Sequence, residues 1–237
     1  MESTWIFKIG PIAFDGTILM MTILTVLIIF LLVFWASRKM TIVPKGKQNV
    51  LEFVVDFVNG LGKDNLGSVE SQRFSLFTFS LFSFILISNE IGLVTKIETP
   101  GEISLWKSPT ANPIVTLTLA ATVIILSNSM GVKKFGFVKY FKNSFMRPPA
   151  FMLPLNLLEE FTNTLTLALR LYGNIFAGEI LLGLIVTMAT TLPYLYPLSI
   201  VFEIVWIGFS LFIGAVQAYV FTLLTTIYLS HKVLAEH

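Results

Sequence analysis

Twenty consecutive residues near the start of the chain, 17–36, carry no charge and read TILMMTILTVLIIFLLVFWA. In a helix that rises about 1.5 Å per residue, this segment is long enough to cross a hydrocarbon core of about 30 Å. The residues that flank it are the acids Glu2 and Asp15, and neither the basic region nor the small-residue cleavage site of a signal peptide is present. The segment therefore predicts a retained first membrane span.

Further apolar stretches follow along the chain, separated by charged blocks. Residues 74–94 and 113–130 predict a second and a third span, and two longer stretches occupy 153–192 and 197–230. Only 13% of the 237 residues are charged, against about 25% in an average soluble domain. The sequence thus predicts an all-α integral membrane protein with five membrane-crossing helices in a single membrane domain, 1–237.

The basic residues predict the orientation of these spans. Segment 37–73 carries six Lys and Arg residues and segment 131–150 carries five, whereas the alternate segments hold only Lys8, Lys96 and Lys107. Because cytoplasmic loops carry the excess of Lys and Arg, we expect the N-terminus outside and the C-terminus inside.

Segment 48–62, QNVLEFVVDFVNGLG, has its apolar residues at helical spacing, while Glu52, Asp56 and Asn59 lie on the other side. This pattern predicts an amphipathic helix within a charged cytoplasmic connection. The helix would lie along the membrane surface or against a partner helix.

The last two apolar stretches are too long for upright spans. As continuous helices, 153–192 and 197–230 would measure about 60 and 50 Å, and neither contains a polar turn that would divide it. The Pro-flanked turn 193–197 joins them. We therefore expect two long, strongly tilted helices that form an antiparallel hairpin, since tilt accommodates excess length.

Several ionisable or amide side chains lie within the predicted spans. A charge in the middle of a membrane helix costs about 2.5–3.5 kcal/mol, so such residues usually pair or line water-filled paths. They are Glu90 at the outer end of the second span, Glu159, Glu160, Arg170 and Glu179 in the fourth, and Glu203 and Gln217 in the fifth.

Helical spacing sorts these residues into faces. Glu179 lies nine residues beyond Arg170, which places it on roughly the opposite face of the helix, about 13 Å further outward. A second set of residues follows at successive steps of four, three, four and four positions, which places its members on one stripe of the helix. They are Glu159, Asn163, Thr166, Arg170 and Asn174.

The final helix has its own polar stripe, in which Glu203, Ser210 and Gln217 recur every seven residues. In a hairpin that turns near residue 195, residues whose numbers sum to about 390 lie at the same depth. Arg170 is then level with the region of Gln217, and Glu179 with that of Ser210. This layout of acids toward each face, with an arginine between them, predicts two half-paths separated by a fixed positive charge.

Structural alternatives exist for each of these residues. Glu159 and Glu160 are also compatible with an interfacial helix end, Glu90 and Glu203 with an interface or rim position, and Gln217 with an interhelical hydrogen bond. A structural ion pair is the alternative for Arg170, although no acid lies three or four residues from it.

The motif LALRLYGNIFAGE at 167–179, with GAVQAYVF at 214–221 and IYL at 227–229, resembles the subunit a family of the F-type ATP synthase membrane sector. The resemblance covers essentially the whole chain. The length and the Glu159-Glu160 pair are similar to those of Bacillus-type bacterial members, which implies a bacterial plasma membrane protein.

The resemblance also implies roles for individual residues. Arg170 matches the family arginine that faces the ring of c subunits, and Asn174, Glu179 and Gln217 match polar positions on the proton path. Ser210 stands where some relatives carry histidine, so a histidine relay is absent there. The implied partners are the c ring, the b subunits of the peripheral stalk, the remainder of the complex and the lipid bilayer.

Other function classes are less compatible with the residues present. The chain has no cysteine, and its only histidines are His231 and His237, so we expect no cofactor, no metal site and no catalytic Cys or buried His. It also lacks the phosphate-binding GxxxxGK[ST] loop, so we expect no nucleotide chemistry. We also expect no nucleic acid partner. The alternative function is a self-contained ion-coupled secondary transporter, although such proteins often show internal repeats and broken helices.

Overall fold

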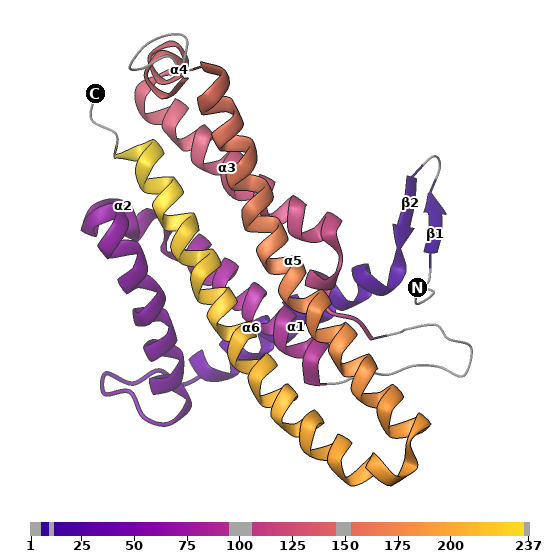
Figure 1. Cartoon of the computed structure of the whole chain (residues 1–237). Helices are drawn as coiled ribbons and strands as arrows, with labels where there is room; N and C mark the ends of the chain where they lie inside the picture. The colour runs from indigo at the N-terminus through magenta and orange to yellow at the C-terminus, as the bar shows by residue number, and fades with distance from the viewer. Residues whose placement is uncertain (1–5, 10–11, 95–105, 146–152, 235–237) are drawn as a thin grey trace. The chain divides into compact units, whose positions relative to one another are not determined.

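Long helices dominate the structure, a computed structural model that describes all residues except 1–5, 10–11, 95–105, 146–152 and 235–237 (Figure 1). Lys96 and Arg147, two of the basic residues used to orient the chain, lie outside the described residues. Five helices are long and apolar enough to cross a membrane, as predicted. They are α1 (Gly16–Ser37), α2 (Lys47–Val94), α3 (Pro113–Phe135), α5 (Leu153–Thr191) and α6 (Tyr196–Val233).

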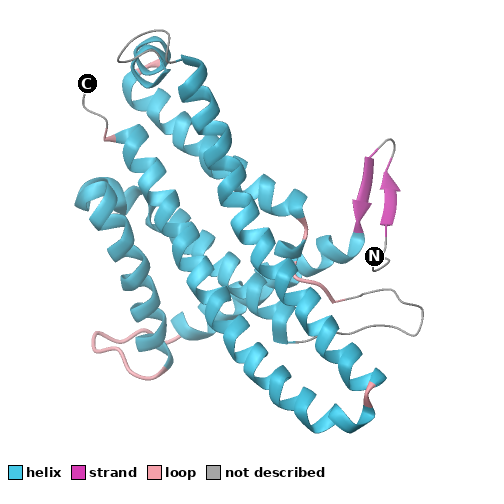
Figure 2. Ribbon diagram, in the orientation of Figure 1, coloured by secondary structure: helices cyan, strands magenta, loops and turns pink. Residues whose placement is uncertain are grey.

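The all-α fold class is confirmed, with one small addition that the sequence analysis did not anticipate. Strands β1 (Ile6–Ile9) and β2 (Ile12–Asp15) form an antiparallel hairpin directly before α1, as Figure 2 shows. Asp15 ends this hairpin and caps α1, because its Oδ1 accepts a hydrogen bond from the Ile18 amide at 3.3 Å.

The structure divides into two compact units, and the long helices α2, α3, α5 and α6 contribute to both. The first unit contains residues 1–38, 83–115 and 171–218. It therefore holds the hairpin, α1, the end of α2, a short 3₁₀ helix at Pro109–Ala111, and the connected ends of α5 and α6. A second 3₁₀ helix, Pro193–Leu195, connects these ends of α5 and α6.

The second unit contains residues 39–82, 116–170 and 219–237. Its apolar core forms where Leu66, Phe74 and Leu229 meet, with Phe77 and Met130 packed against them. Two hydrogen bonds fix the first part of α2 to α6 near this core. Asn65 Nδ2 donates to Thr226 Oγ1 at 3.0 Å, and Ser230 Oγ donates to the Asn65 carbonyl at 2.6 Å.

The segment predicted as an amphipathic helix at 48–62 lies at the start of α2. Gly67 has φ 75° and ψ 170°, a conformation available to glycine, and it separates the helical stretch 47–66 from 68–94. Within the second unit, Phe57 of the first stretch contacts Tyr219 of α6 and Phe82. The first stretch of α2 therefore contacts α6 within the second unit, and its placement along the membrane surface or against a partner helix stays a prediction.

A further short helix, α4 (Phe137–Phe145), follows α3 and was not predicted. Gly136, at φ 82°, provides the turn between the two helices. Tyr140 of α4 packs so closely on Gly131 of α3 that a β-carbon there would lie 2.4 Å from the tyrosine ring. The Tyr140 hydroxyl also donates a hydrogen bond to Asn128 Oδ1, which holds α4 against α3.

Candidate functional site

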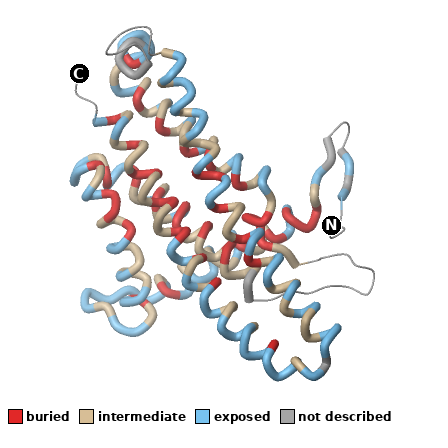
Figure 3. Tube along the Cα trace, viewed as in Figure 1, coloured by how far each residue is buried: buried red, intermediate tan, exposed pale blue. Residues whose placement is uncertain are grey.

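Arg170 lies on an exposed side of α5, next to the exposed Leu169, whereas Leu171 on its other side is buried. Leu167, Leu171 and Ile175 form the buried stripe of the helix, with at most 1% of each side chain exposed. Thr166 and Glu159, which share the predicted stripe with Arg170, are also exposed. Figure 3 shows exposed and buried segments alternating along the long helices. Glu159, Thr166 and Arg170 of this stripe therefore lie on the exposed side of the helix, while its other members, Asn163 and Asn174, are half-buried.

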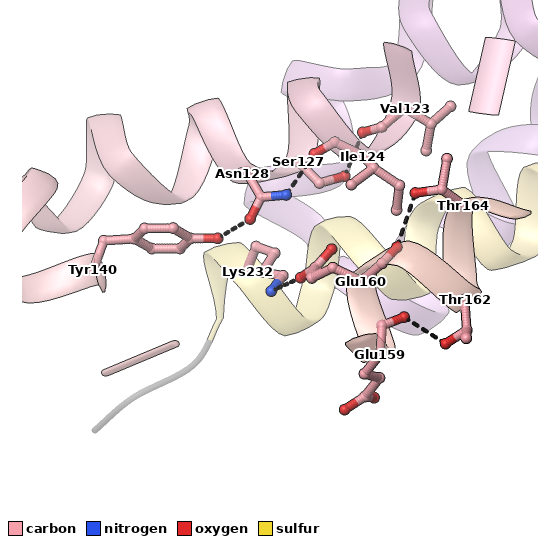
Figure 4. A network of polar contacts seen from close by, with 10 residues as sticks. All are labelled: Val123, Ile124, Ser127, Asn128, Tyr140, Glu159, Glu160, Thr162, Thr164 and Lys232. Atoms are coloured by element: carbon pink, nitrogen blue, oxygen red, sulfur yellow. Dashed lines mark hydrogen bonds and ion pairs between the residues drawn. The ribbon is translucent and has the colours of Figure 1, made fainter. Parts of the chain in front are cut away.

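Near the start of α5, the two adjacent glutamates have different surroundings (Figure 4). Glu160 forms an ion pair with Lys232 of α6, and about one sixth of each side chain is exposed. The Glu159 carboxylate is exposed and points away from this pair. Glu160 thus acts as an interhelical ion-pair partner within the second unit, while Glu159 stays available at the surface.

Tyr228 of α6 lies among the charged residues of this region. Arg170, Glu160 and Glu159 are all close enough to its hydroxyl to interact with it electrostatically. The second unit therefore brings three predicted site residues around one phenol group that the sequence analysis did not select.

In the first unit, α5 and α6 enclose a cavity of about 220 Å³. Two predicted site residues, Asn174 and Ser210, line it together with Gly178, which directly precedes Glu179. Ser210 is 6% exposed. The hairpin rule predicted that Ser210 and Glu179 lie at similar depths, and the lining of this cavity agrees with that placement.

Glu179 is half-buried and forms an ion pair with Lys107, with 3.9 Å between Glu179 Oε2 and Lys107 Nζ. Lys107 belongs to the segment between α2 and α3, where the sequence analysis treated it only as a topological marker. An acid and a base from different elements therefore meet at this position. Glu203 of α6 and Asn163 of α5 are both half-buried.

A polar network lies where the end of α2 meets α6 in the first unit. Asn89 is fully buried, and both the nitrogen and the oxygen of its side-chain amide form hydrogen bonds. Its Nδ2 donates to the Gly214 carbonyl at 3.2 Å, and its Oδ1 accepts from Thr110 Oγ1 at 2.8 Å. Beside it, Ser108 Oγ donates to the Ser88 carbonyl at 2.7 Å. These bonds join α2, α6 and the 3₁₀ helix Pro109–Ala111 in one place.

Two other predicted site residues lie at this junction. The Glu90 carboxylate rests against Gly214, where a β-carbon would stand 3.0 Å from Glu90 Oε1. Gln217 follows Gly214 by one helical turn and is 6% exposed. Its Nε2 and Glu90 Oε1 are both buried, and neither has a hydrogen-bond partner among the described residues.

Lys107, Lys232 and Tyr228 are the contributors that sequence reasoning missed. A signal existed for Lys232, because 160 and 232 sum to 392, close to the value that the hairpin rule requires. For Lys107 no periodic pattern applies, since it lies in a connection between helices. Among the described residues, no group of three His, Cys, Asp or Glu side chains could hold a metal ion.

The fold and these polar groups define a class of protein: a multi-pass helical membrane protein that holds carboxylates and the exposed Arg170 within its spans. Residues 18–230 match the family described as ATP synthase A chain. The chain therefore belongs to the ATP synthase A chain family, and it is a multi-pass protein of the bacterial plasma membrane.

Individual relatives are similar along almost their entire length. The chain is 55% identical to ATP synthase subunit a of Enterococcus hirae and 53% identical to that of Enterococcus faecalis, each over 236 residues and 99% of both chains. It is 49% identical to ATP synthase subunit a of Streptococcus pneumoniae strain 70585 over 231 residues, which are 98% of this chain and 96% of the relative. The resemblance found in the motifs is thereby confirmed.

Proposed function

We propose that this chain is the non-catalytic stator subunit that passes protons to and from the c-ring carboxylates of an F-type ATP synthase. Two offset half-paths would reach the ring from opposite faces of the membrane, with Arg170 between them. The observation that carries the proposal is the exposure of Arg170 on α5, on the same side of the helix as the exposed Glu159 and Thr166. An arginine at such a position is accessible to a partner that supplies a carboxylate.

The outer half-path would use Glu179 and the cavity lined by Asn174 and Ser210. These groups all belong to the first unit, and the cavity offers space for water beside two polar side chains. The Lys107 ammonium holds the Glu179 carboxylate at a defined position next to this cavity. Gln217 and Glu203 contribute further polar groups from α6.

The inner half-path would use the exposed Glu159, with Asn163 one turn further along the helix. Tyr228 lies within electrostatic range of both Glu159 and Arg170, so its hydroxyl is suited to exchange a proton with water or with Glu159 along this path. The pairing of Glu160 with Lys232 would keep this end of α5 next to α6.

Electrostatics explains how Arg170 would drive release from the ring. At about 4 Å and an effective dielectric constant of about 20, the guanidinium stabilises an ionised carboxylate by about 4 kcal/mol. That energy changes the ionisation equilibrium by roughly a thousandfold. A ring carboxylic acid that is neutral in lipid would therefore lose its proton as it reaches the arginine. Because arginine effectively never deprotonates, it would also repel protons that cross without ring rotation.

The proposal includes the N-terminus-out orientation and strongly tilted α5 and α6 helices that present a broad face to the c ring. The b subunits of the peripheral stalk would hold this subunit in place against the ring. Whether the ring carries H⁺ or Na⁺ is set mostly by the c-subunit site.

The test is to replace Arg170 within the complete ATP synthase, reconstituted in lipid vesicles. Arg170→Ala should abolish ATP synthesis and ATP-driven pumping while passive proton leak persists or increases. Arg170→Lys should also fail in coupled turnover, because an ammonium lacks the planar guanidinium and can lose its proton.

A structural ion-pair role for Arg170 predicts different results: loss of the subunit from the complex, with substantial rescue by lysine. Assembly and flux are therefore measured on the same vesicles. An assembled Arg170→Lys complex that synthesises ATP at nearly the normal rate would refute the barrier role. Ion transport by the purified chain without ring subunits would instead favour a self-contained transporter.

A further inference from the structure

Glu90 occupies a notch that exists only because residue 214 is glycine. A β-carbon on Gly214 would stand 3.0 Å from Glu90 Oε1 and 3.8 Å from the carboxyl carbon. Contacts of 3.0 Å are shorter than ordinary van der Waals distances, so alanine at this position would push the carboxyl group away. The backbone of α6 thus leaves room for one acidic side chain from α2.

The residues around Glu90 hold its carboxyl group in place, but those that the structure describes give its buried oxygen no hydrogen bond. Asn89, the preceding residue, binds Thr110 and the Gly214 carbonyl and uses both ends of its amide to do so. Glu90 Oε1 nevertheless remains buried with no hydrogen-bond partner among the described residues, and no cation pairs with Glu90 there. Most buried polar atoms in proteins are hydrogen-bonded, so an exception at a rigid junction calls for a functional explanation.

A second buried group without a hydrogen-bond partner among the described residues lies on α6, the helix that contains Gly214. Gln217, one turn beyond Gly214, has a buried Nε2 that donates to no acceptor among the described residues. The junction therefore holds a buried carboxyl oxygen and a buried amide donor, neither of which has a hydrogen-bond partner in the described part of the chain. Such groups can bind water, and a carboxyl group can in addition carry a proton.

Few other groups in the first unit can carry protons within the membrane. The chain has no histidine before His231, and the serine hydroxyl of Ser210 does not ionise in the neutral range. Glu179 carries a counter-ion in Lys107, whereas Glu90 does not pair with a cation in the described part of the chain. Glu90 is therefore a carboxyl group of this unit that is both buried at its oxygen and free of a fixed positive charge.

We propose that Glu90 is a proton-carrying residue of the outer half-path, seated in the Gly214 notch and positioned beside Gln217. This inference rests on the proposed function and adds a residue to it. In the uptake step, the Glu90 carboxylate accepts a proton from hydronium, which forms a carboxylic acid and water. In the release step, the acid gives that proton to the next water, and the carboxylate is regenerated.

The test uses the complete ATP synthase in vesicles, with ATP-driven and passive proton flux measured beside subunit assembly. Glu90→Gln keeps the shape and hydrogen-bonding capacity of the side chain but cannot exchange a proton. We expect this variant to assemble normally and to lose about tenfold or more of both fluxes. Glu90→Asp keeps a carboxyl group and should retain more flux than Glu90→Gln.

Gly214→Ala provides an independent test of the notch, because it keeps Glu90 in the sequence and places a β-carbon closest to its carboxyl oxygen, at 3.0 Å, with the Asn89 β-carbon next at 3.4 Å. Gly208→Ala on the same helix is the matched control, since a β-carbon there would meet no atom within 4 Å. We expect Gly214→Ala to lower the flux and Gly208→Ala to leave it unchanged. Infrared difference spectra recorded during flux should contain a protonated-carboxyl band that shifts in D₂O and is missing from Glu90→Gln.

Several outcomes would overturn the inference: wild-type flux in Glu90→Gln, no advantage of aspartate over glutamine, failure of Glu90→Gln to assemble, or an infrared spectrum unchanged by that substitution. A flux that depends on Na⁺ in the wild type, and loses that dependence only in Glu90→Gln, would assign cation binding to Glu90 in place of proton transfer. Arg170→Ala is measured in parallel. If it uncouples as expected while Glu90→Gln behaves as wild type, the inference about Glu90 fails and the proposed function stands.

Discussion

The ion pair between Glu160 and Lys232 allows a quantitative test of how the ends of α5 and α6 are held together. Only 17% of the Glu160 side chain and 16% of the Lys232 side chain are exposed. Removal of one partner of a fully buried pair costs about 3–5 kcal/mol, whereas an exposed pair contributes about 0–1 kcal/mol. Because this pair lies between the two limits, we expect Glu160→Gln and Lys232→Gln each to lower the free energy of unfolding by about 2 kcal/mol.

The double variant distinguishes a pair from two independent contributions. Each single variant leaves one buried charge without its partner, and the double variant removes both charges. We therefore expect the double variant to lose no more stability than either single variant, which corresponds to a coupling free energy of about 2 kcal/mol. Unfolding of the full chain in detergent, followed by helical circular dichroism during denaturant titration, gives the four free energies of this cycle.

Glu159 provides the matched control, since it is adjacent to Glu160 but exposed. Glu159→Gln should change the free energy of unfolding by less than about 0.5 kcal/mol. In the assembled complex the expected order reverses: Glu159→Gln should slow proton flux, and the Glu160→Gln, Lys232→Gln double variant should retain it. Additive losses in the cycle would refute the ion-pair reasoning, and so would unchanged flux in Glu159→Gln combined with strong loss in the double variant.

Three further predictions follow from the described contacts. Glu179→Gln should slow both ATP synthesis and ATP-driven pumping while the complex assembles normally; wild-type flux in vesicles would remove Glu179 from the path. Single cysteines at the exposed residues Phe176 and Phe212, whose numbers sum to 388, should show similar depth-dependent quenching by lipid probes; depths that differ by more than about 11 Å, two helical turns, would mean that the hairpin register is wrong. Gly131→Ala should lower the free energy of unfolding by about 1–3 kcal/mol, because its β-carbon would collide with the α4 ring and with the Lys232 carbonyl. Gly60→Ala, with no atom within 4 Å, should not destabilise the chain, and equal losses in the two variants would contradict this packing argument.

The elements that depend on long apolar runs could be predicted closely from the sequence. The stretch predicted at 153–192 is α5, Leu153–Thr191, and the stretch at 197–230 lies within α6, Tyr196–Val233. Hydrophobic length decides these boundaries, because a helix is the simplest way for one segment to satisfy its own backbone in lipid. The hairpin rule succeeded for the same reason, as the Glu160–Lys232 pair illustrates.

Elements whose cause is a single residue or a tertiary contact could not be predicted in this way. The break in α2 depends on one positive φ angle at Gly67, and α4 begins after another at Gly136. The same residue type also occurs inside regular helices, at Gly60 and Gly208, so the presence of a glycine does not by itself predict a break. Hydrophobic periodicity therefore gives no warning of these turns.

The same distinction, between features set by spacing along one helix and features set by tertiary contacts, applies to the candidate site. Spacing along one helix predicted which residues share a face, and the exposure of Arg170 agrees with that prediction. Spacing cannot predict which element lies opposite, so the Lys107–Glu179 pair and the notch that Gly214 provides for Glu90 required the structure. The decisive feature of that notch is a missing side chain, which no search for chemically active residues would select.

The exposure of Arg170 is compatible in energy with the rotating partner that the proposed function assigns to it. In the second unit, Arg170 is exposed along with Leu169 and Phe161, which are 51% and 67% exposed. A charge among such residues costs about 2.5–3.5 kcal/mol in the membrane, and a ring carboxylate would offset this by about 4 kcal/mol. A proton that crosses the membrane supplies about 2.3 kcal/mol per 100 mV. Because the attraction and the supplied energy are similar in size, the proposed mechanism would let the arginine ionise each ring carboxyl group and still let it move on, whereas an arginine buried in a fixed ion pair would bind its partner without turnover.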